Sequence, residues 1–372
     1  MSRLSSMILR EVSSKDYINI KKLFRRNHLK MISLNRWNNL WLKNPILKDG
    51  KKRWVKGWIL EQDKKVVGHV GNFPMKYFLN KKSYICAVLN GWVVDKKFRS
   101  NSILLVKKYF SQLNVDFFLG TSFNVKTSKI MQAMGVKEVP TDGLDNSLII
   151  ILKSTSVMKY FFGNKSFLFK NFFLNFLSIL LLFFFKKRFN HWENKFSIKN
   201  IIQCKVIDKR FDALWKKIKF LQKNKMLFKR DTIWLKWHLD PFLKRKKAWI
   251  FLSIKDNKIN GYTICIEKKN SKKGIKFALL IDLITLNDFD QTSKNLIGAN
   301  IKEAKKRNCD IFEFRGFSEV KRSYMKFFKP FEKKLLLNPF YYKSKNEKLS
   351  KLLNNRRHWD PSYIDGDAIV NL

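Results

Sequence analysis

Acidic side chains are scarce in this chain of 372 residues, which has 29 Asp and Glu against 77 Lys and Arg and a formal net charge of +48. Such an excess of cations suggests nucleic-acid binding. The cations are mainly lysines, however, spread along the whole chain among abundant Asn, Ile and Phe, a set of residues that A/T-rich codon usage produces unaided. The sequence has no basic helix, zinc finger or aromatic-interleaved RNA motif. We therefore explain the charge first by codon usage and then by an anionic membrane surface, and we argue against nucleic acid as a partner.

Cysteine is also rare, since the chain has only four: Cys86, Cys204, Cys265 and Cys309. They lie far apart, with no C-x-x-C pair and no histidine at ligand spacing, which argues against a disulfide framework and against a metal site. We expect buried thiols in a reducing compartment. The apolar run at residues 7–9 is too short for a signal peptide, so the expected location is cytoplasmic.

Four short motifs occur twice, in the same order. Residues 41–43 (WLK) return at 234–236, residues 58–60 (WIL) at 249–251 (WIF), Gly68 at Gly261, and residues 115–118 (VDFF) at 309–312 (CDIF). The spacing between the copies stays close to 193 residues. A constant offset over several motifs indicates two copies of one domain.

The pattern of each copy predicts a pair of helices, a meander of strands, a helix, a strand and a final helix. In the first copy a strand at residues 8–12 precedes helices at 14–26 and 34–42, and strands near 58–62, 66–78 and 85–94 follow. We therefore predict a mixed α/β (α+β) fold of two tandem domains, each a mostly antiparallel sheet flanked by helices. The expected division is residues 1–155, 156–200 and 201–372.

The segment between the copies is strongly apolar. Of residues 167–185, all but Lys170, Asn171, Asn175 and Ser178 are apolar, and Lys and Arg flank the run on both sides. Such a segment fits a helix in the plane of an anionic membrane, contacting it through residues 159–188. A helix packed between the two domains explains the pattern equally well. A membrane span is third, because it would leave the two matching domains on opposite sides.

A cofactor site is predicted where the long strand of the first copy ends. A strand ending at Val93 and Val94 leads through residues 95–98 into a helix start, and a helix N-terminus presents free backbone N–H groups and positive potential to a pyrophosphate. A second candidate helix start follows at Asn124. The predicted cofactor-binding residues are Val93, Val94, Arg99, Ser100, Asn101, Ser102, Ile103, Leu104 and Asn124.

These residues resemble the motifs of the GNAT superfamily of acyl-CoA N-acyltransferases. The family's pyrophosphate loop reads V-x-P-x-Y-R-G-x-G-x-G/A, and residues 94–104 occupy that frame. Its later motif, N-x-x-A-x-x-L-Y-x-x-x-G-F, is matched by residues 124–136 at Asn124, Ile130 and Gly135. The whole chain looks like the tandem acyltransferases associated with bacterial envelope polysaccharides, and its closing residues 359–367 (WDPSYIDGD) look typical of such chains.

The sequence also departs from the family's motifs. Ser102 and Leu104 replace loop glycines that let a backbone approach phosphate closely. Met131 replaces the tyrosine that protonates the departing thiolate in the family, and a thioether has no proton to donate. In the second copy, residues 286–290 (LNDFD) carry two carboxylates where a pyrophosphate would need donors, which predicts a degenerate site.

Three residues of the first copy are candidates for the general base: His69, Asn90 and Glu61. The family often places this role on the strand before the pyrophosphate loop, where this chain has Asn90. His69 is the one imidazole near it in the sequence pattern, although a histidine on a strand more often makes structural hydrogen bonds. Glu61 precedes a turn and is expected to be solvated. We name His69 and Asn90 as the predicted catalytic residues.

The resemblance implies an enzyme that transfers an acyl group from acetyl-CoA or another acyl-CoA to an amino sugar or other cell-envelope precursor, at the inner face of the cytoplasmic membrane. The departures from the family's motifs would weaken its activity. One alternative is a non-catalytic scaffold or binding protein of polysaccharide assembly. Another is an aminoacyl-tRNA-dependent transferase of cell-wall precursors, which is also built on paired domains.

Overall fold

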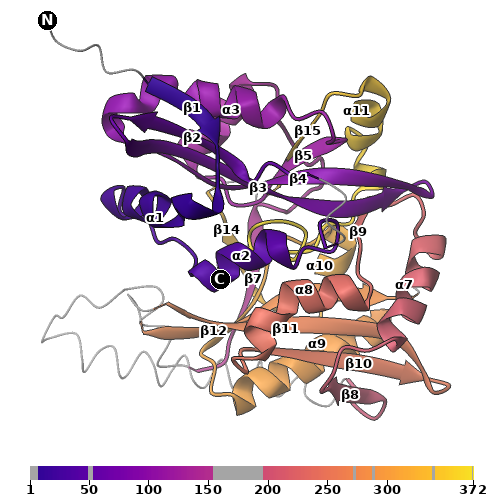
Figure 1. Ribbon diagram of the computed structural model, residues 1–372. Coiled ribbons are helices and arrows are strands. Elements are labelled where there is room, and N and C mark those ends of the chain that lie inside the picture. Colours follow the sequence, from indigo (N-terminus) through magenta and orange to yellow (C-terminus); the bar gives the residue numbers. More distant parts are fainter. Residues whose placement is uncertain are drawn as a thin grey trace, which may run out of the picture.

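The computed structural model describes residues 7–48, 53–153, 196–270, 274–286, 290–336, 340–370 and 372. Two mixed sheets lie one above the other in Figure 1, each flanked by helices, and helices α2 and α8 lie between them. We call them the first lobe and the second lobe. The predicted fold class, two tandem α/β domains with mostly antiparallel sheets, is confirmed.

The first lobe contains helices α1 (Tyr17–Arg26), α2 (Leu34–Leu42), α3 (Ser102–Phe110) and α4 (Val125–Ala133), with 3-10 helices η1 (Ser14–Asp16) and η2 (Lys96–Asn101). Its strands from its own part of the chain are β1 (Met7–Glu11), β2 (Gly57–Gln62), β3 (Lys65–Leu79), β4 (Lys82–Val94), β5 (Phe117–Gly120) and β6 (Lys137–Glu138). They pair antiparallel except for β4 and β5, which are parallel.

The second lobe repeats this order. Its helices are α7 (Arg210–Leu221), α8 (Thr232–Leu243), α9 (Asp290–Lys306), α10 (Glu319–Lys326) and α11 (Glu347–Leu353), with the 3-10 helix η3 (Arg356–His358). Its strands are β8 (Ile201–Cys204), β10 (Ala248–Lys255), β11 (Lys258–Asn270), β12 (Ile275–Thr285), β13 (Ile311–Phe314) and β14 (Phe331–Lys334), while the short β9 (Leu227–Phe228) pairs with β3 of the first lobe. Here β12 and β13 form the parallel pair.

The two lobes exchange one strand each. Strand β7 (Asn146–Ile151) follows the first lobe in the chain but lies between β13 and β14 of the second sheet. Strand β15 (Tyr341–Ser344) comes near the end of the chain and lies between β5 and β6 of the first sheet, as Figure 1 shows. The domain division at residues 155 and 201 stays a prediction. Each sheet contains one strand from the other side of that division, β15 in the first sheet and β7 in the second.

Matching elements carry the repeated motifs. The two WLK motifs fall in α2 and α8, and the WIL and WIF motifs fall in β2 and β10. The hairpins that follow turn through Asp63-Lys64 and Asp256-Asn257, four residues with positive φ. Consecutive residues of positive φ form the two-residue turn whose twist suits a hairpin. The duplication in the sequence is therefore a duplication of structure.

Tryptophans of the paired helices α2 and α8 make buried hydrogen bonds, one of them between the lobes. Trp41 of α2 donates from Nε1 to the Asn72 carbonyl at 2.9 Å, and Trp237 of α8 donates from Nε1 to the Asn39 carbonyl at 2.8 Å. The second bond runs from one lobe to the other. Both indoles are buried, so each bond satisfies a polar group that burial would otherwise leave unpaired.

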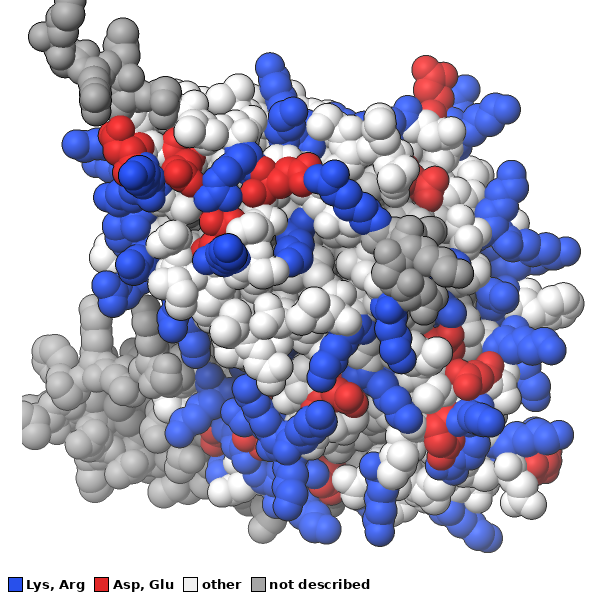
Figure 2. Space-filling model, viewed as in Figure 1, with Lys and Arg blue, Asp and Glu red and all other residues white. Residues whose placement is uncertain are grey.

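The predictions about the cysteines and the charged surface can be compared with the described residues. All four cysteines are buried and free. Figure 2 shows Lys and Arg side chains around the edges and over the lower part of the visible face, with acidic side chains among them, while the middle of the face is largely uncharged. The predicted linker helix at residues 167–185 lies outside the described residues. Among the helices that are described, none has the length and hydropathy needed to cross a membrane.

Candidate functional site

The parallel strands β4 and β5 separate at their carboxyl ends. Their pairing runs from Cys86–Phe117 to Val88–Leu119, after which β4 continues to Val94 and β5 ends at Gly120. Beyond both ends the chain enters a helix, α3 after β4 and α4 after β5. Because the carboxyl ends of adjacent parallel strands lie at one edge of the sheet, the starts of α3 and α4 lie at the same edge.

A bulge bends β4 where it leaves β5. The register with β3 jumps between Gly71–Asn90 and His69–Val93, which leaves an extra residue in β4. Gly91 lies in the bulge with φ of +69°, a conformation that glycine adopts without strain. Bulges commonly occur beside active sites because they redirect neighbouring backbone groups.

His69 is held by this bulge. Its Nδ1 lies 2.6 Å from the Gly91 carbonyl oxygen. A carbonyl only accepts, so Nδ1 carries the hydrogen and Nε2 remains an acceptor. Burial lowers the pKa of His69 to about 4, although the bond to Gly91 acts in the opposite direction. His69 is therefore neutral near pH 7 and is a weak base.

Asn90 and Trp92 flank Gly91 with unused donors. The Nδ2 of Asn90 and the Nε1 of Trp92 are both buried and have no hydrogen-bond partner among the described residues. A neutral amide accepts no proton near pH 7, so Asn90 fits the predicted role of a base poorly. It fits better as a hydrogen-bond donor to a ligand oxygen. Glu61, the third candidate base, is bound by Arg10 at 2.7 Å.

The predicted phosphate segment, residues 95–104, starts with a short helix. Residues 96–101 form η2, and α3 begins at Ser102. Both the backbone N–H and the hydroxyl of Ser102 donate to the Arg99 carbonyl, the hydroxyl at 2.6 Å. One backbone donor that a glycine-rich loop would offer to phosphate is thus already used. The Arg99 side chain is exposed.

The remaining predicted cofactor residues surround this helix start. Val93 and Val94 are buried at the end of β4, whereas Leu104 on the first turn of α3 is 38% exposed. Asn124 is the N-cap of α4, and its side-chain oxygen accepts from the Thr127 N–H at 2.9 Å. The predicted residues on β4 and η2–α3 are thus contiguous, and Asn124 follows the neighbouring strand. Their role in binding stays a prediction.

Aromatic side chains fill the opening between β4 and β5. A Cβ on Gly120 would lie 2.2 Å from the ring of Phe123, so this ring packs directly on the end of β5. Phe123 also lies against Tyr341 of β15, with ring centroids 5.0 Å apart. The cavity that remains among these side chains and Met131 is about 10 Å³, room for at most one water molecule. Met131 itself is fully buried.

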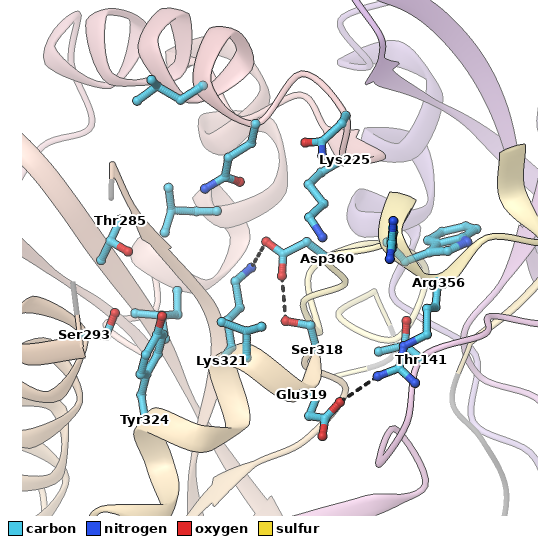
Figure 3. Close-up of a pocket in the computed structure, with 18 residues that line it drawn as sticks. Thr141, Lys225, Thr285, Ser293, Ser318, Glu319, Lys321, Tyr324, Arg356 and Asp360 are labelled. Atoms are coloured by element: carbon cyan, nitrogen blue, oxygen red, sulfur yellow. Dashed lines mark hydrogen bonds and ion pairs between the residues drawn. The ribbon is translucent and has the colours of Figure 1, made fainter. Parts of the chain in front are cut away.

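The corresponding place in the second lobe is open. A cavity of about 430 Å³ lies at the carboxyl end of β12, beside the first turns of α9 and α10, and we call it the second-lobe pocket. Figure 3 shows Thr285 of β12, Ser293 of α9 and Lys321 and Tyr324 of α10 around it. A volume of this size falls in the range of small-molecule sites.

Residues from the end of the chain form another wall of this pocket. Asp360 accepts from the Ser318 hydroxyl at 2.6 Å and pairs with Lys321 at 2.9 Å, and Figure 3 draws both contacts. Burial raises the pKa of Asp360, but Lys321 and Ser318 lower it more, so this carboxyl stays ionised. Arg356 pairs with Glu319 at 3.0 Å across the rim. The start of α10 is thereby fixed by side chains rather than by a conventional cap.

The closing segment then runs on between the two lobes. Arg230, which is 2% exposed, binds Asp282 of β12 at 2.9 Å and Asp365 at 2.7 Å. Asp367 accepts from Thr121, at the end of β5 in the first lobe, at 2.7 Å. Residues 359–367, for which no role was predicted, thus connect the carboxyl ends of both parallel strand pairs.

The second-lobe pocket was missed by the sequence analysis. Its residues come from Thr141 of the first copy, the end of α7, three elements of the second copy and the C-terminal motif. No spacing in the sequence brings these together, and the one usable signal is the cluster of Asp residues in that motif. Most of the acidic segment at 286–290, predicted to mark a degenerate site, lies outside the described residues.

Comparison with known proteins identifies the fold. No protein-family model matches the sequence, and no curated protein matches it. The N-myristoyltransferase of Saccharomyces cerevisiae, solved with bound myristoyl-CoA, superposes with a TM-score of 0.56 at 13% identity, covering 92% of this chain and 83% of that chain. A probable N-acyltransferase from Enterococcus faecalis gives 0.56 at 10% identity, with 92% and 73% covered. A GCN5-related N-acetyltransferase from Kribbella flavida gives 0.54 at 8%, with 91% and 71% covered.

These similarities extend over both lobes. The prediction of two tandem N-acyltransferase-like domains is therefore confirmed as a fold. Because one fold hosts many chemistries, the activity must be argued from the site.

Proposed function

We propose that the protein is an acyl-CoA-dependent N-acyltransferase whose first lobe holds the donor. The observation that carries this proposal is the parting of β4 and β5 at a bulge, directly beside a helix start rich in cations. Such a site joins a slot between strands to a place for phosphate groups. The N-myristoyltransferase with this fold was solved with bound myristoyl-CoA, which supports the choice of donor.

The residues at the helix start fit the phosphate end of such a donor. Lys96, Lys97 and Arg99 are exposed on η2, immediately before α3. Their charges and the positive end of the helix favour a phosphate group. The Ser102 N–H is already bonded, so side-chain cations rather than a glycine-rich backbone would supply most of the binding.

The slot between the strands fits the thioester end only if Phe123 moves. Its ring occupies the end of β5, and the remaining space is about 10 Å³. For the donor to the thioester oxygen we propose Asn90, whose Nδ2 is buried and has no hydrogen-bond partner among the described residues. A donor placed where charge develops in the transition state is an effective catalytic group.

Proton transfer in this site would be weakly assisted. In the proposed reaction the acceptor amine attacks the thioester carbon, the C–S bond breaks, and the amine loses a proton. Neutral His69 has a pKa of about 4, so it would take that proton inefficiently. The thiolate is a good leaving group because a thiol pKa lies near ~8.5, and it can take its proton from water. We therefore expect a slow enzyme.

For the acceptor we propose an amino sugar or another cell-envelope precursor, met at the inner face of the cytoplasmic membrane. The resemblance of the whole chain, and of its residues 359–367, to the tandem acyltransferases associated with bacterial envelope polysaccharides supports this choice. The basic-flanked apolar run at 159–188 would supply the membrane contact.

The test is a calorimetric titration of the full chain with acetyl-CoA and with free CoA. We expect binding in the micromolar to millimolar range, weakened about tenfold by Arg99→Gln, since a charge-assisted hydrogen bond contributes roughly 1.5–3 kcal/mol. Lys107→Gln is the matched control, because Lys107 is exposed on the last turn of α3.

A non-catalytic binding protein is the second candidate function, and the closed slot around Phe123 favours it. Absence of any heat with either compound at millimolar concentration would reject the enzyme and leave this candidate. Equal losses for Arg99→Gln and Lys107→Gln would show that CoA binds by general attraction to a basic surface.

A further inference from the structure

The second-lobe pocket contains polar atoms that the protein itself leaves unused. Thr141, Ser293 and Gln222 line the pocket. The two hydroxyl oxygens and the Gln222 Oε1 are buried and have no hydrogen-bond partner among the described residues. Ser293 is fully buried. An unpaired buried polar group costs free energy, so three of them around one cavity indicate a polar ligand.

The donor and acceptor atoms of the pocket restrict the chemical class of the ligand. Gln222 Oε1 only accepts, whereas the two hydroxyls both donate and accept. A ligand that satisfies all three must itself carry several hydroxyl or N–H groups. Trp359 and Tyr324 also line the pocket and offer aromatic surface. Hydroxyl groups around an apolar ring face are the chemistry of a sugar.

The charged side chains of the pocket indicate the charge of the ligand. The pocket is lined by four cations, Lys225, Lys321, Arg356 and Arg357, and by two carboxylates, Glu319 and Asp360. Lys321 and Arg356 are paired with those carboxylates. Lys225 has no ion-pair partner in the described part of the chain, and Figure 3 shows its side chain directed into the cavity. A free ammonium group there favours an anionic ligand, and phosphate is the anion sugars most often carry.

We propose that the second-lobe pocket binds a phosphorylated sugar, recognised through Lys225, Ser293 and Gln222. This site belongs to the second lobe and is separate from the proposed donor slot between β4 and β5. It concerns binding alone and does not depend on whether the first lobe binds acyl-CoA. Together with the proposed donor slot of the first lobe, the pocket would select the acceptor of the transfer reaction.

The experiment is a calorimetric titration of the full chain with glucosamine 6-phosphate, with UDP-N-acetylglucosamine, with glucosamine and with inorganic phosphate. We expect one of the two phosphorylated sugars to bind at least tenfold more tightly than either glucosamine or phosphate. The better of the two distinguishes a sugar phosphate from a nucleotide-linked sugar. Equal affinity for inorganic phosphate, or no binding of either phosphorylated sugar at millimolar concentration, would overturn the proposal.

Two variants locate the ligand. Lys225→Gln should weaken binding about tenfold, while Lys223→Gln, an exposed lysine outside the pocket, should leave it unchanged. Ser293→Ala should weaken binding severalfold and leave the melting temperature of the ligand-free protein unchanged or higher, because it removes an unpaired buried hydroxyl. Equal effects of the two lysine variants, or an unchanged affinity in Ser293→Ala, would show that the ligand does not occupy this pocket.

Discussion

The two lobes share one plan and use the same place differently. In the first lobe the parallel strands part beside a cationic helix start, and Phe123 fills the opening. In the second lobe the matching opening holds a cavity of about 430 Å³, and Arg230 and the closing segment brace the strand beside it. Duplication thus preserves the backbone and leaves the side chains at the strand ends free to diverge.

The brace in the second lobe gives the largest expected effect. Arg230→Met leaves Asp282 and Asp365 as buried carboxylates without their cation, and breaking such a pair typically costs about 3–5 kcal/mol. We expect a loss of that size in the free energy of unfolding, measured in urea. Arg210→Met is the matched control, since the side chains of Arg210 and its partner Asp208 are 49% and 40% exposed, and it should cost under about 0.5 kcal/mol. Similar losses for both variants would contradict the brace.

The buried histidine of the first lobe predicts a dependence of stability on pH. The pKa of His69 is about 4 in the folded protein and about 6.5 in an unfolded chain. Between these values the unfolded chain binds more protons, so the free energy of unfolding falls as the pH is lowered from about 6.5 toward 4. At pH 4.5 the expected loss from this group is about 2–3 kcal/mol.

His69→Gln isolates this contribution. The variant should lose less stability than the wild type between pH 7 and pH 4.5, measured as the shift of the urea midpoint. Parallel curves for the two proteins would mean that His69 is not held neutral. His238, whose pKa burial lowers to about 3, stays in both proteins and cancels in the difference.

Replacing Phe123 tests whether this one side chain closes the slot between β4 and β5. Phe123→Ala should tighten acetyl-CoA binding about tenfold, because the ring no longer has to move, a change of about 1.4 kcal/mol. Phe220→Ala, which removes a ring that is 71% exposed on α7, should not change the affinity. Weaker binding by Phe123→Ala would mean that the ring contacts the ligand instead of excluding it.

Ser102 gives the smallest expected effect. Ser102→Gly removes the hydroxyl that is bonded to the Arg99 carbonyl and lets phosphate approach the backbone more closely, so acetyl-CoA should bind about threefold more tightly. Ser111→Gly is the control, since its hydroxyl is bonded in the same way to Lys108 at the far end of α3. If both variants bind acetyl-CoA as the wild type does, Ser102 is not a steric obstacle.

Much of the fold was predictable because it rests on local patterns. Repeated WLK and WIL motifs, the turn at Asp63-Lys64 and the helix cap at Asn124 depend on residues close in sequence. The exchange of β7 and β15 was not predictable, since residues 146–151 form an apolar strand whichever sheet receives them. The second-lobe pocket was not predictable either, because folding brings Thr141, Gln222 and Ser293 together from three distant segments of the chain.

Met131 stands where the GNAT motif has a proton-donating tyrosine, so the resemblance implies that Met131→Tyr would raise the transfer rate. Met131 is fully buried beneath the slot, so a tyrosine there would overpack the core, at a cost of typically 1–3 kcal/mol. A position in a motif thus does not establish that its side chain reaches the ligand.

The strand exchange also constrains the timing of folding during synthesis. Strand β5 ends at residue 120, but its neighbour β15 starts at residue 341, so at about 5–20 residues per second the ribosome needs roughly 10–40 seconds more before the first sheet can be completed. Throughout that interval β5 has an unpaired edge, and β7 waits for a sheet that does not yet exist. Exposed edges invite pairing with other chains. A gene cut between the lobes would therefore encode two incomplete sheets, and the first sheet can be completed only after residue 344 has been synthesised.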